Sequence, residues 1–468
     1  MKRFTLAYFL FASAMVLAQN DMYANVNLQF RLDNPGARAH AMGGAFVGLA
    51  DDTTAIFANP AGLTQMLSST LVADFGHTSY DHEIPFYGGE IRRVGLQDFD
   101  FNLESRDFPD DTTSVPFLGY VHSGERLKWG VFYAEQLRFK RDFSTAGVSI
   151  PPYSGPTNTV NNPLVFFNPS QNSVDLKLRT LGVSLAGKLT DHVSVGVTAS
   201  FNQLDYKANT TLLIPDIEAL FPDINFSPDL LDQLRPFIGQ PSGIIDADGD
   251  DQRPGVFAGL FWEPNERFGL GLSYQYQPEF EYGYTTQSTD ASFQLLPPES
   301  GTAKFDVPDR FAGGFSFKPT ETFVLALEVA RLQYSDLVNP YYRFFEVEND
   351  PSNESQTIED TTEYRLGMEY IFANMAYPLA IRAGYWLEPY HALQNTNLDT
   401  QTLFGFVDDN GDFVQGFRSN AFLQRFEDDR NHITFGFGFS FGRHLVVDFA
   451  ADLADDIDNY SVSGIYRF

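Results

Sequence analysis

The chain has 468 residues, a formal net charge of -30 at pH 7 and no cysteine. The acidic surplus argues against nucleic acid as a partner, because proteins that bind it present basic surfaces to the phosphates. Without cysteine, an exported chain must be held together by something other than disulfides, and a closed hydrogen-bonded barrel is one such means.

Aromatic residues make up 15% of the chain, with 46 Phe and 22 Tyr. An ordinary water-soluble domain would bury so many Phe side chains. A membrane β-barrel instead presents them to lipid, in an outward band with aromatic girdles at both interfaces. The composition therefore favours a barrel whose acidic residues lie in solvated loops or in a wet lumen.

Residues 1–18 have the features of an export signal. Lys2 and Arg3 precede an apolar run from Phe4 to Leu17, and small residues ending at Ala18 form a cleavage site. The alternative, a membrane-anchoring helix, needs roughly 20 apolar residues, and this run is shorter. We expect the mature protein to begin near residue 19.

Residues 19–68 are expected to form a plug. The stretch 34–66 is apolar but consists largely of small residues, so it needs walls supplied by another part of the chain. Asn59 and Pro60 form a turn pair followed by Ala61. The backbone is able to turn and to approach other surfaces closely at Gly36, Gly43, Gly44, Gly48 and Gly62.

Residues 69–468 show the two-residue period of barrel strands, beginning near Ser69. Large apolar Leu181, Val183 and Leu185 alternate with small residues, and the same pattern recurs up to the terminal Phe468. A soluble β-sandwich would also alternate, but it would not usually expose Phe on strand after strand. The pattern predicts an all-β transmembrane barrel of about 14 antiparallel strands with the plug inside its lumen.

Three long insertions, near residues 82–113, 210–253 and 391–430, are expected outside the cell. The second contains two short helical patterns, at 215–221 and 227–234, with Ser227 as an N-cap and Pro228 at the first helical position. Either the two helices cover each other, or their apolar residues form an external surface that captures hydrophobic substrate. The residues concerned are Ile217, Leu220, Phe221, Leu230, Leu231 and Leu234.

In four segments the sequence resembles FadL-type outer-membrane channels for long-chain fatty acids and other hydrophobic compounds. The start, NLQFRLDNPGARAHAMGGAFVGLADDTTAIFANPAGL, is similar to the family's N-terminal hatch, including Asp51, Asp52 and the Asn59-Pro60-Ala61 element. Further on, GVFAGLFWEPNERFGLGLSYQYQPEFEYGY, DVPDRFAGGFSFKPTETFVLALEVARLQYSDL and LAIRAGYWLEPYHALQN are similar to later strand pairs. Their collinear order covers nearly all of the mature chain.

The resemblance implies a 14-stranded barrel closed by the hatch. It also implies capture of a hydrophobic substrate between extracellular loops, passage to an apolar lumen pocket, and lateral exit where the third strand kinks inward. The matching stretch here is 133–139, YAEQLRF. It has Gln136 where a glycine would ease the kink, and it places Glu135 and Arg138 in the strand.

Arg382 is the candidate for binding an acidic head group. It lies in the strand 379–387 on the face opposite the apolar residues, so it points into the lumen, where it could bind a carboxylate. The alternative is an internal salt bridge with Glu369 or Glu328. Asp51 and Asp52 have a similar alternative, since they could tether the plug to arginines of the lumen.

Other chemistry has less support in the sequence. The stretches 246–251 and 408–412 place carboxylates at alternate positions beside a glycine, as calcium loops do, but neither has the full loop signature. The eight histidines show no metal-ligand spacing, and neither a nucleophile elbow nor a phosphate-binding loop is present. We expect no enzyme activity, no cofactor and no resident metal.

Together these features predict a monomeric bacterial outer-membrane channel that takes up hydrophobic small molecules such as fatty acids and is surrounded by lipid. The alternative is an adaptor, because the N-terminal motif also resembles PorV-type barrels that shuttle secreted proteins. A continuous apolar passage from the loop helices to a gap in the wall would favour transport. A plugged lumen with a broad loop surface would favour the shuttle.

Overall fold

The computed structural model describes residues 32–93, 99–151, 165–290, 292–337, 356–391, 394–395, 405–407, 413–415 and 429–468. The expected export signal, the acidic stretch 408–412 and most of the third insertion lie outside these residues. Within them, no helix combines the length and the apolar character that crossing a membrane requires.

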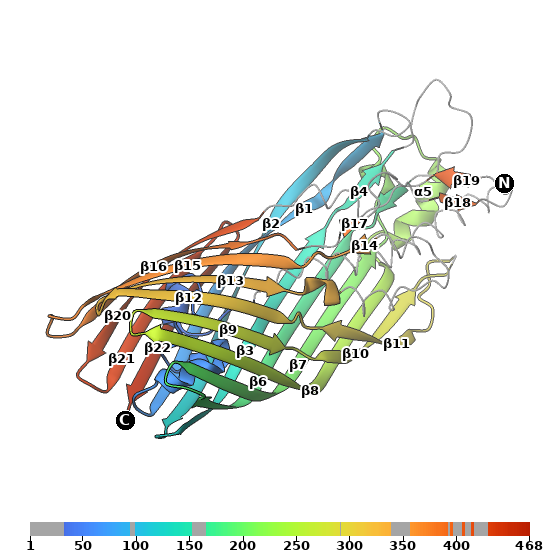
Figure 1. The fold of residues 1–468 in the computed structure, drawn as a ribbon. Helices are drawn as coiled ribbons and strands as arrows, with labels where there is room; N and C mark the ends of the chain where they lie inside the picture. Colours follow the sequence, from blue (N-terminus) through green and yellow to red (C-terminus); the bar gives the residue numbers. More distant parts are fainter. Residues whose placement is uncertain are drawn as a thin grey trace.

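The described residues form a closed barrel of 14 antiparallel strands, in which each wall strand pairs with the wall strands before and after it (Figure 1). Closure comes from β22, which pairs with β1 from Thr70↔Arg467 to Tyr80↔Ile457. The predicted strand number is confirmed. The wall strands are β1 (Thr70–Arg93), β2 (Phe99–Ser123), β3 (Leu127–Thr145), β6 (Ser170–Lys188), β7 (Val193–Leu213), β8 (Pro241–Asn265), β9 (Phe268–Tyr276), β12 (Arg310–Thr320), β13 (Phe323–Leu332), β15 (Thr361–Phe372), β16 (Leu379–Glu388), β20 (Arg430–Phe441), β21 (Leu445–Leu453) and β22 (Ile457–Arg467).

Shorter elements gather inside the barrel and at the end opposite the C-terminus (Figure 1). Four strands extend the main sheet, namely β4 (Gly147–Ile150), β5 (Val165–Phe167), β10 (Glu279–Ser288) and β11 (Glu299–Asp306). Two small pairs are β14 (Gln356–Thr357) with β17 (Gln394–Asn395), and β18 (Gly405–Val407) with β19 (Phe413–Gln415). The helices are α2 (Ala37–Ala41), α3 (Ala55–Ala58), α4 (Ile217–Leu220) and α5 (Pro228–Leu234), and the 3-10 turns are η1 (Pro60–Gln65), η2 (Arg235–Phe237) and η3 (Tyr334–Leu337).

The wall alternates between lipid-facing and lumen-facing side chains as the period predicted. On β6, Leu181 and Leu185 are 59% and 46% exposed, whereas Ser184 between them is fully buried. On β20, Phe435 points outward and Thr434 inward. Large apolar side chains on an outer surface are stable only against lipid, so the alternation identifies a membrane-spanning wall.

The plug, residues 34–66, lies inside the barrel near the end that holds the C-terminus (Figure 1). Helix α2 lies against β20, β21 and β22, and η1 lies against β6, β7 and β8. Small residues are needed here because main chains touch: a Cβ on Gly48 would lie 2.3 Å from the carbonyl carbon of Gly314 on β12. Gly43 adopts φ +63°, a conformation that glycine reaches without steric cost.

Two of the expected insertions contain more regular structure than the sequence indicated. Residues 82–113 are mostly a continuation of the β1–β2 pair, which runs on as a two-stranded ribbon. In the second insertion, β7 continues to Leu213 and β8 resumes at Pro241, so only residues 214–240 form the loop with α4 and α5. The acidic stretch 246–251 lies within β8 and pairs residue by residue with β7, so it forms no calcium-type turn.

Candidate functional site

A buried ion-pair cluster holds the plug to the wall. Arg38 of α2 binds Glu369 of β15 through both Nε and Nη2, each at 2.9 Å, and Asp51 through Nη1 at 2.5 Å. Lys318 of β12 lies 3.4 Å from the second oxygen of Asp51. Asp51 and Asp52 therefore bind an arginine of the plug itself, and the lumen cation on Asp51 is a lysine rather than the expected arginine.

The two plug carboxylates respond oppositely to this setting. Burial disfavours the ionised form of Asp51, but Arg38 and Lys318 outweigh it and hold the pKa of Asp51 below its ordinary value. Burial also acts on Asp52, where it prevails over the attraction of Arg38 and raises the pKa. Asp52 accepts hydrogen bonds from the main-chain and side-chain groups of Thr54. Both carboxylates thus pair with Arg38, and Asp52 additionally binds Thr54 just before α3.

Arg382 belongs to the same cluster. Its Nε donates to Glu369 at 2.6 Å and its Nη1 donates to Asp448 of β21 at 2.6 Å, and its side chain is 5% exposed. The structure therefore shows the ion-pair alternative with Glu369, and the head-group role of Arg382 stays a prediction. Glu328, the other candidate partner, instead binds Arg310 and accepts from the main-chain N–H groups of the plug.

Asn59 stabilises the turn of the plug formed by Asn59, Pro60 and Ala61. Its Oδ1 accepts from the N–H of Ala61 at 3.2 Å, which caps η1. Its Nδ2 donates to the carbonyl of Val47 at 3.0 Å and to that of Leu260 on β8 at 3.2 Å. One buried side chain thus joins two parts of the plug and the wall, while Pro60 occupies the first position of η1, where no N–H is needed.

Above the plug, the lumen is filled by apolar side chains that we call the lumen cluster. They come from wall strands on several sides, from β10 and β11, and from η3. The cluster includes Leu137 and Phe139 of β3. Its buried members are Leu32, Val47, Leu137, Phe139, Val174, Leu176, Leu178, Leu204, Tyr206, Phe280, Tyr282, Ala303, Phe305, Val307, Ala312, Ala330, Leu332, Tyr334 and Ile358.

At β3 the wall comes apart on one side. Pairing between β2 and β3 runs from Ser123↔Lys128 to Phe117↔Ala134 and then stops, although both strands continue. Beyond this point β3 pairs with β6 alone, with a β-bulge between Glu135 and Leu137. A bulge bends its strand, so β3 leaves β2 here.

Gln136 is the extra residue of this bulge. Its Nε2 donates to Thr180 of β6, and its Oε1 accepts from Gln277 at 2.8 Å. The expectation that a glycine eases the kink does not apply here, because hydrogen bonds hold the bulged residue in place. In the sequence this bulge is visible only as polar residues at successive positions of a wall strand, Glu135 and Gln136.

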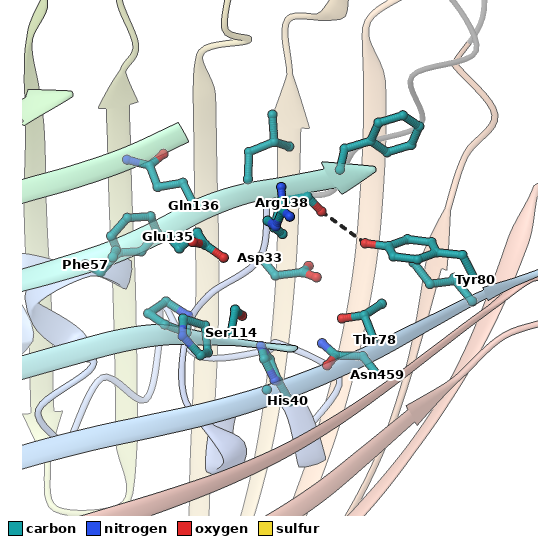
Figure 2. A pocket seen from close by; sticks show the side chains of 17 residues that line it. Asp33, His40, Phe57, Thr78, Tyr80, Ser114, Glu135, Gln136, Arg138 and Asn459 are labelled. Carbon is teal, nitrogen blue, oxygen red and sulfur yellow. Dashed lines mark hydrogen bonds between the residues drawn. The ribbon is translucent and has the colours of Figure 1, made fainter. Parts of the chain in front are cut away.

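A cavity of about 110 Å³ lies where β3 separates from β1 and β2. Figure 2 shows Glu135, Gln136 and Arg138 of β3 on one side, and Thr78 of β1 and Asn459 of β22 on the other. The plug supplies Asp33, Pro35, His40 and Phe57, and the lumen cluster supplies Leu137 and Phe139.

The cavity lies at the edge of the lipid-facing band. Glu135 is paired with Arg179 of β6, and the next outward side chain of that strand is the exposed Leu181. Across the opening, the hydroxyl of Tyr80 donates to the free carbonyl of Arg138 at 3.1 Å, as Figure 2 shows. The opening therefore lies at the level where the outward-facing residues of the wall change from apolar to charged.

The loop helices form with the predicted caps. Ser227 Oγ accepts from the N–H of Leu230, and Pro228 is the first residue of α5. Of the apolar residues named above, Ile217, Phe221 and Leu234 are buried, and Phe221 packs edge-on against Phe166 of β5. The half-buried residues Leu220, Leu230 and Leu231 keep part of their surface in contact with solvent.

Comparisons with known proteins agree with this geometry. Residues 165–400 match the family described as outer membrane protein transport protein (OMPP1/FadL/TodX). Among curated protein sequences, none matches this chain significantly.

Solved structures with low sequence identity share the fold. The toluene transporter TodX of Pseudomonas putida is 17% identical, covers 94% of this chain and 99% of its own, and has a TM-score of 0.56. The monoaromatic hydrocarbon channel CymD gives the same values. A FadL homologue of Pseudomonas aeruginosa is 14% identical, covers 92% of this chain and 98% of its own, and also has a TM-score of 0.56. With its plugged 14-stranded barrel and a family match over half of its length, this chain belongs to the OMPP1/FadL/TodX family of bacterial outer-membrane channels for hydrophobic compounds.

Proposed function

We propose that this chain takes up hydrophobic small molecules through the lumen cluster and releases them sideways between β2 and β3. The observation that carries the proposal is the continuity between lumen and opening: Leu137 and Phe139 belong to both the lumen cluster and the lining of the lateral cavity. A bore closed by a plug leaves the side wall as the exit for a molecule that water rejects.

Lateral release suits the chemistry of such a substrate. A hydrophobic molecule that left through the plug would enter the aqueous periplasm, and its apolar surface would be returned to water. A molecule that leaves beside β3 reaches the wall at the level where Leu181 faces lipid. Release into the membrane therefore keeps the apolar surface covered throughout.

Capture at the extracellular side is the second part of the proposal. Leu220, Leu230 and Leu231 provide partly exposed apolar surface on α4 and α5, and the remaining helix residues anchor this surface to the barrel. The adaptor alternative predicted a plugged lumen without a passage. The apolar residues that the lumen cluster shares with the lateral cavity, Leu137 and Phe139, favour transport over that alternative.

Two substrate classes fit this route, long-chain fatty acids and monoaromatic compounds. The cavity of about 110 Å³ is of the order of the roughly 150 Å³ interior cavity that accommodates benzene. The names of the solved relatives TodX and CymD concern toluene and monoaromatic hydrocarbons. We therefore propose one-ring compounds as the better-fitting class and fatty acids as the second.

Uptake of labelled toluene and oleate by cells with and without the gene tests both classes. Faster uptake of either compound by cells carrying the gene supports transport, whereas equal uptake of both compounds by the two strains rules it out. The lateral exit is tested by Ser114→Trp, which places an indole into the opening, because Ser114 lines the cavity. Thr113→Trp is the matched control, since Thr113 is exposed on the other face of β2.

We expect Ser114→Trp to lose most of the uptake and Thr113→Trp to retain it. Folding of both variants is checked by heat-modifiable migration in gel electrophoresis, which reports a closed barrel. A folded Ser114→Trp barrel with wild-type uptake would exclude exit between β2 and β3.

A further inference from the structure

The lateral cavity contains a hydrogen-bond acceptor whose bonding is incomplete. Glu135 is the first residue of β3 after its pairing with β2 ends, and its carboxylate lines the cavity beside the hydroxyl of Ser114, which interacts with one side of it (Figure 2). Its Oε1 atom is buried and has no hydrogen-bond partner. A buried carboxylate oxygen without a partner costs free energy, so the site is stabilised when a donor arrives.

The neighbouring cations do not supply that donor. The guanidinium of Arg138, three residues along β3, binds Asp175 of β6. The guanidinium of Arg179, which is paired with Glu135 across the strands, binds Asp205 of β7. Both guanidinium groups are engaged by carboxylates of their own. The Glu135 carboxylate is therefore the acidic acceptor among the residues of β3 that an occupant of the cavity meets.

The rest of the cavity defines what such an occupant looks like. Phe57 of the plug and Leu137 and Phe139 of β3 give it an apolar side large enough for a ring. Glu135 stands at the polar side, near the opening. A molecule with an apolar body and one O–H or N–H group would fill both sides at once, whereas a pure hydrocarbon would leave the acceptor unpaired.

We propose that Glu135 accepts a hydrogen bond from the substrate in the lateral cavity, so that the channel favours hydrophobic compounds bearing a hydroxyl or amine group. The inference rests on the proposed function, because it assigns a specificity to the proposed exit. A carboxylic acid is disfavoured at the same point, since its charge would meet the charge of Glu135 across a short distance. The selected class is thus phenols, aromatic amines and similar neutral donors.

Four para-substituted toluenes test the proposal, because they share a ring and a methyl group and differ in one substituent. They are p-xylene, p-cresol, p-toluidine and p-toluate. Binding of each to the purified full-length protein is measured at pH 7 for the wild type, for Glu135→Gln, which keeps the shape, and for Glu125→Gln. The last is the matched control, because Glu125 is an exposed carboxylate in the turn at the other end of β3.

We expect Glu135→Gln to weaken binding of p-cresol and p-toluidine by about tenfold, the loss typical when a charged hydrogen-bond acceptor becomes neutral. Binding of p-xylene should change less than about twofold and p-toluate should bind more tightly, while Glu125→Gln changes none of the four. Equal effects of Glu135→Gln on p-cresol and p-xylene would overturn the inference.

Uptake of p-xylene by cells separates this inference from the proposed function. Wild-type uptake no faster than that of cells lacking the gene would remove the transport proposal itself. Rapid p-xylene uptake together with unchanged binding ratios in Glu135→Gln would remove only the role of Glu135.

Discussion

Replacing Arg382 with alanine tests what holds the plug in the bore. The side chain is 5% exposed, and it binds Glu369 and Asp448, which are themselves almost fully buried. Glu369 keeps Arg38 in the variant, but Asp448 loses the only cation that binds it among the described residues. Stripping one partner from a buried ion pair costs about 3–5 kcal/mol. Because only one of the two carboxylates is left alone, we expect about 3 kcal/mol.

The free energy of unfolding is measured by urea titration of the reconstituted barrel, followed by tryptophan fluorescence. Arg331→Ala is the control, because Arg331 forms an exposed ion pair with Asp360 at 3.3 Å, and such pairs contribute less than about 1 kcal/mol. Combining Arg382→Met with Asp448→Leu should restore most of the lost stability, since it removes both charges together. An Arg382→Ala barrel within about 0.5 kcal/mol of the wild type would refute the anchoring role.

The same variant distinguishes the two roles considered for Arg382. A loosened plug affects every substrate, so the ion-pair role predicts that uptake of oleate and toluene changes by the same factor. A head-group role predicts that uptake of oleate falls further than uptake of toluene. Parallel changes would discard the head-group role.

Three further predictions concern the plug. Gly48→Val pushes methyl groups into the main chain of β12 and should prevent a folded, heat-modifiable barrel, whereas Gly464→Val, whose Cβ meets nothing within 4 Å, should fold. Asn59→Ala leaves the buried groups that Asn59 bonds without partners and should lower the unfolding free energy by about 1–3 kcal/mol in the same urea titration; an unchanged midpoint would contradict this. The lowered pKa of Asp51 means that its contribution is present above about pH 4 and is lost as pH falls through the lower folded-state pKa. The deficit of Asp51→Asn relative to the wild type should therefore shrink between pH 7 and pH 3, and a constant deficit would count against the ion pair. The raised pKa of Asp52 acts in the opposite direction, since protonation of Asp52 favours the fold.

The strand pattern could be predicted from the sequence because contact with lipid constrains each residue separately. Leu181 faces lipid and Ser184 faces the plug, and each requirement acts on a single residue through its place in a two-residue period. The plug was accessible for a related reason: main-chain contacts such as Gly48 against Gly314 demand glycine, and that demand is visible as composition.

The ion pairs that form inside the lumen could not be predicted from the sequence in the same way. Arg382, Glu369 and Glu328 were all recognisable as inward charges, yet the barrel register gives Arg310 to Glu328 and leaves Glu369 between Arg38 and Arg382. Those pairings depend on residues far apart in the chain, which periodicity cannot connect.

The gap in the wall was expected at residues 133–139 from the family resemblance alone, because the periodic pattern does not reveal it. The bulge at Gln136 uses side-chain hydrogen bonds instead of a glycine, so no glycine marks its position. The end of β2–β3 pairing at Ala134 is likewise a property of two strands together. The charges of Glu135 and Arg138 within a wall strand were the visible sign, and their meaning depends on that lost pairing.

The seam between β22 and β1 has a consequence for biogenesis. It joins the first wall strand to the last, so the ring cannot close before β22 is available to pair with β1. Helix α2 rests on β20, β21 and β22, and it therefore lacks its final contacts during all of that time. The plug, which precedes every wall strand in the chain, is consequently among the last segments to be covered, and its small apolar side chains stay accessible until the barrel closes.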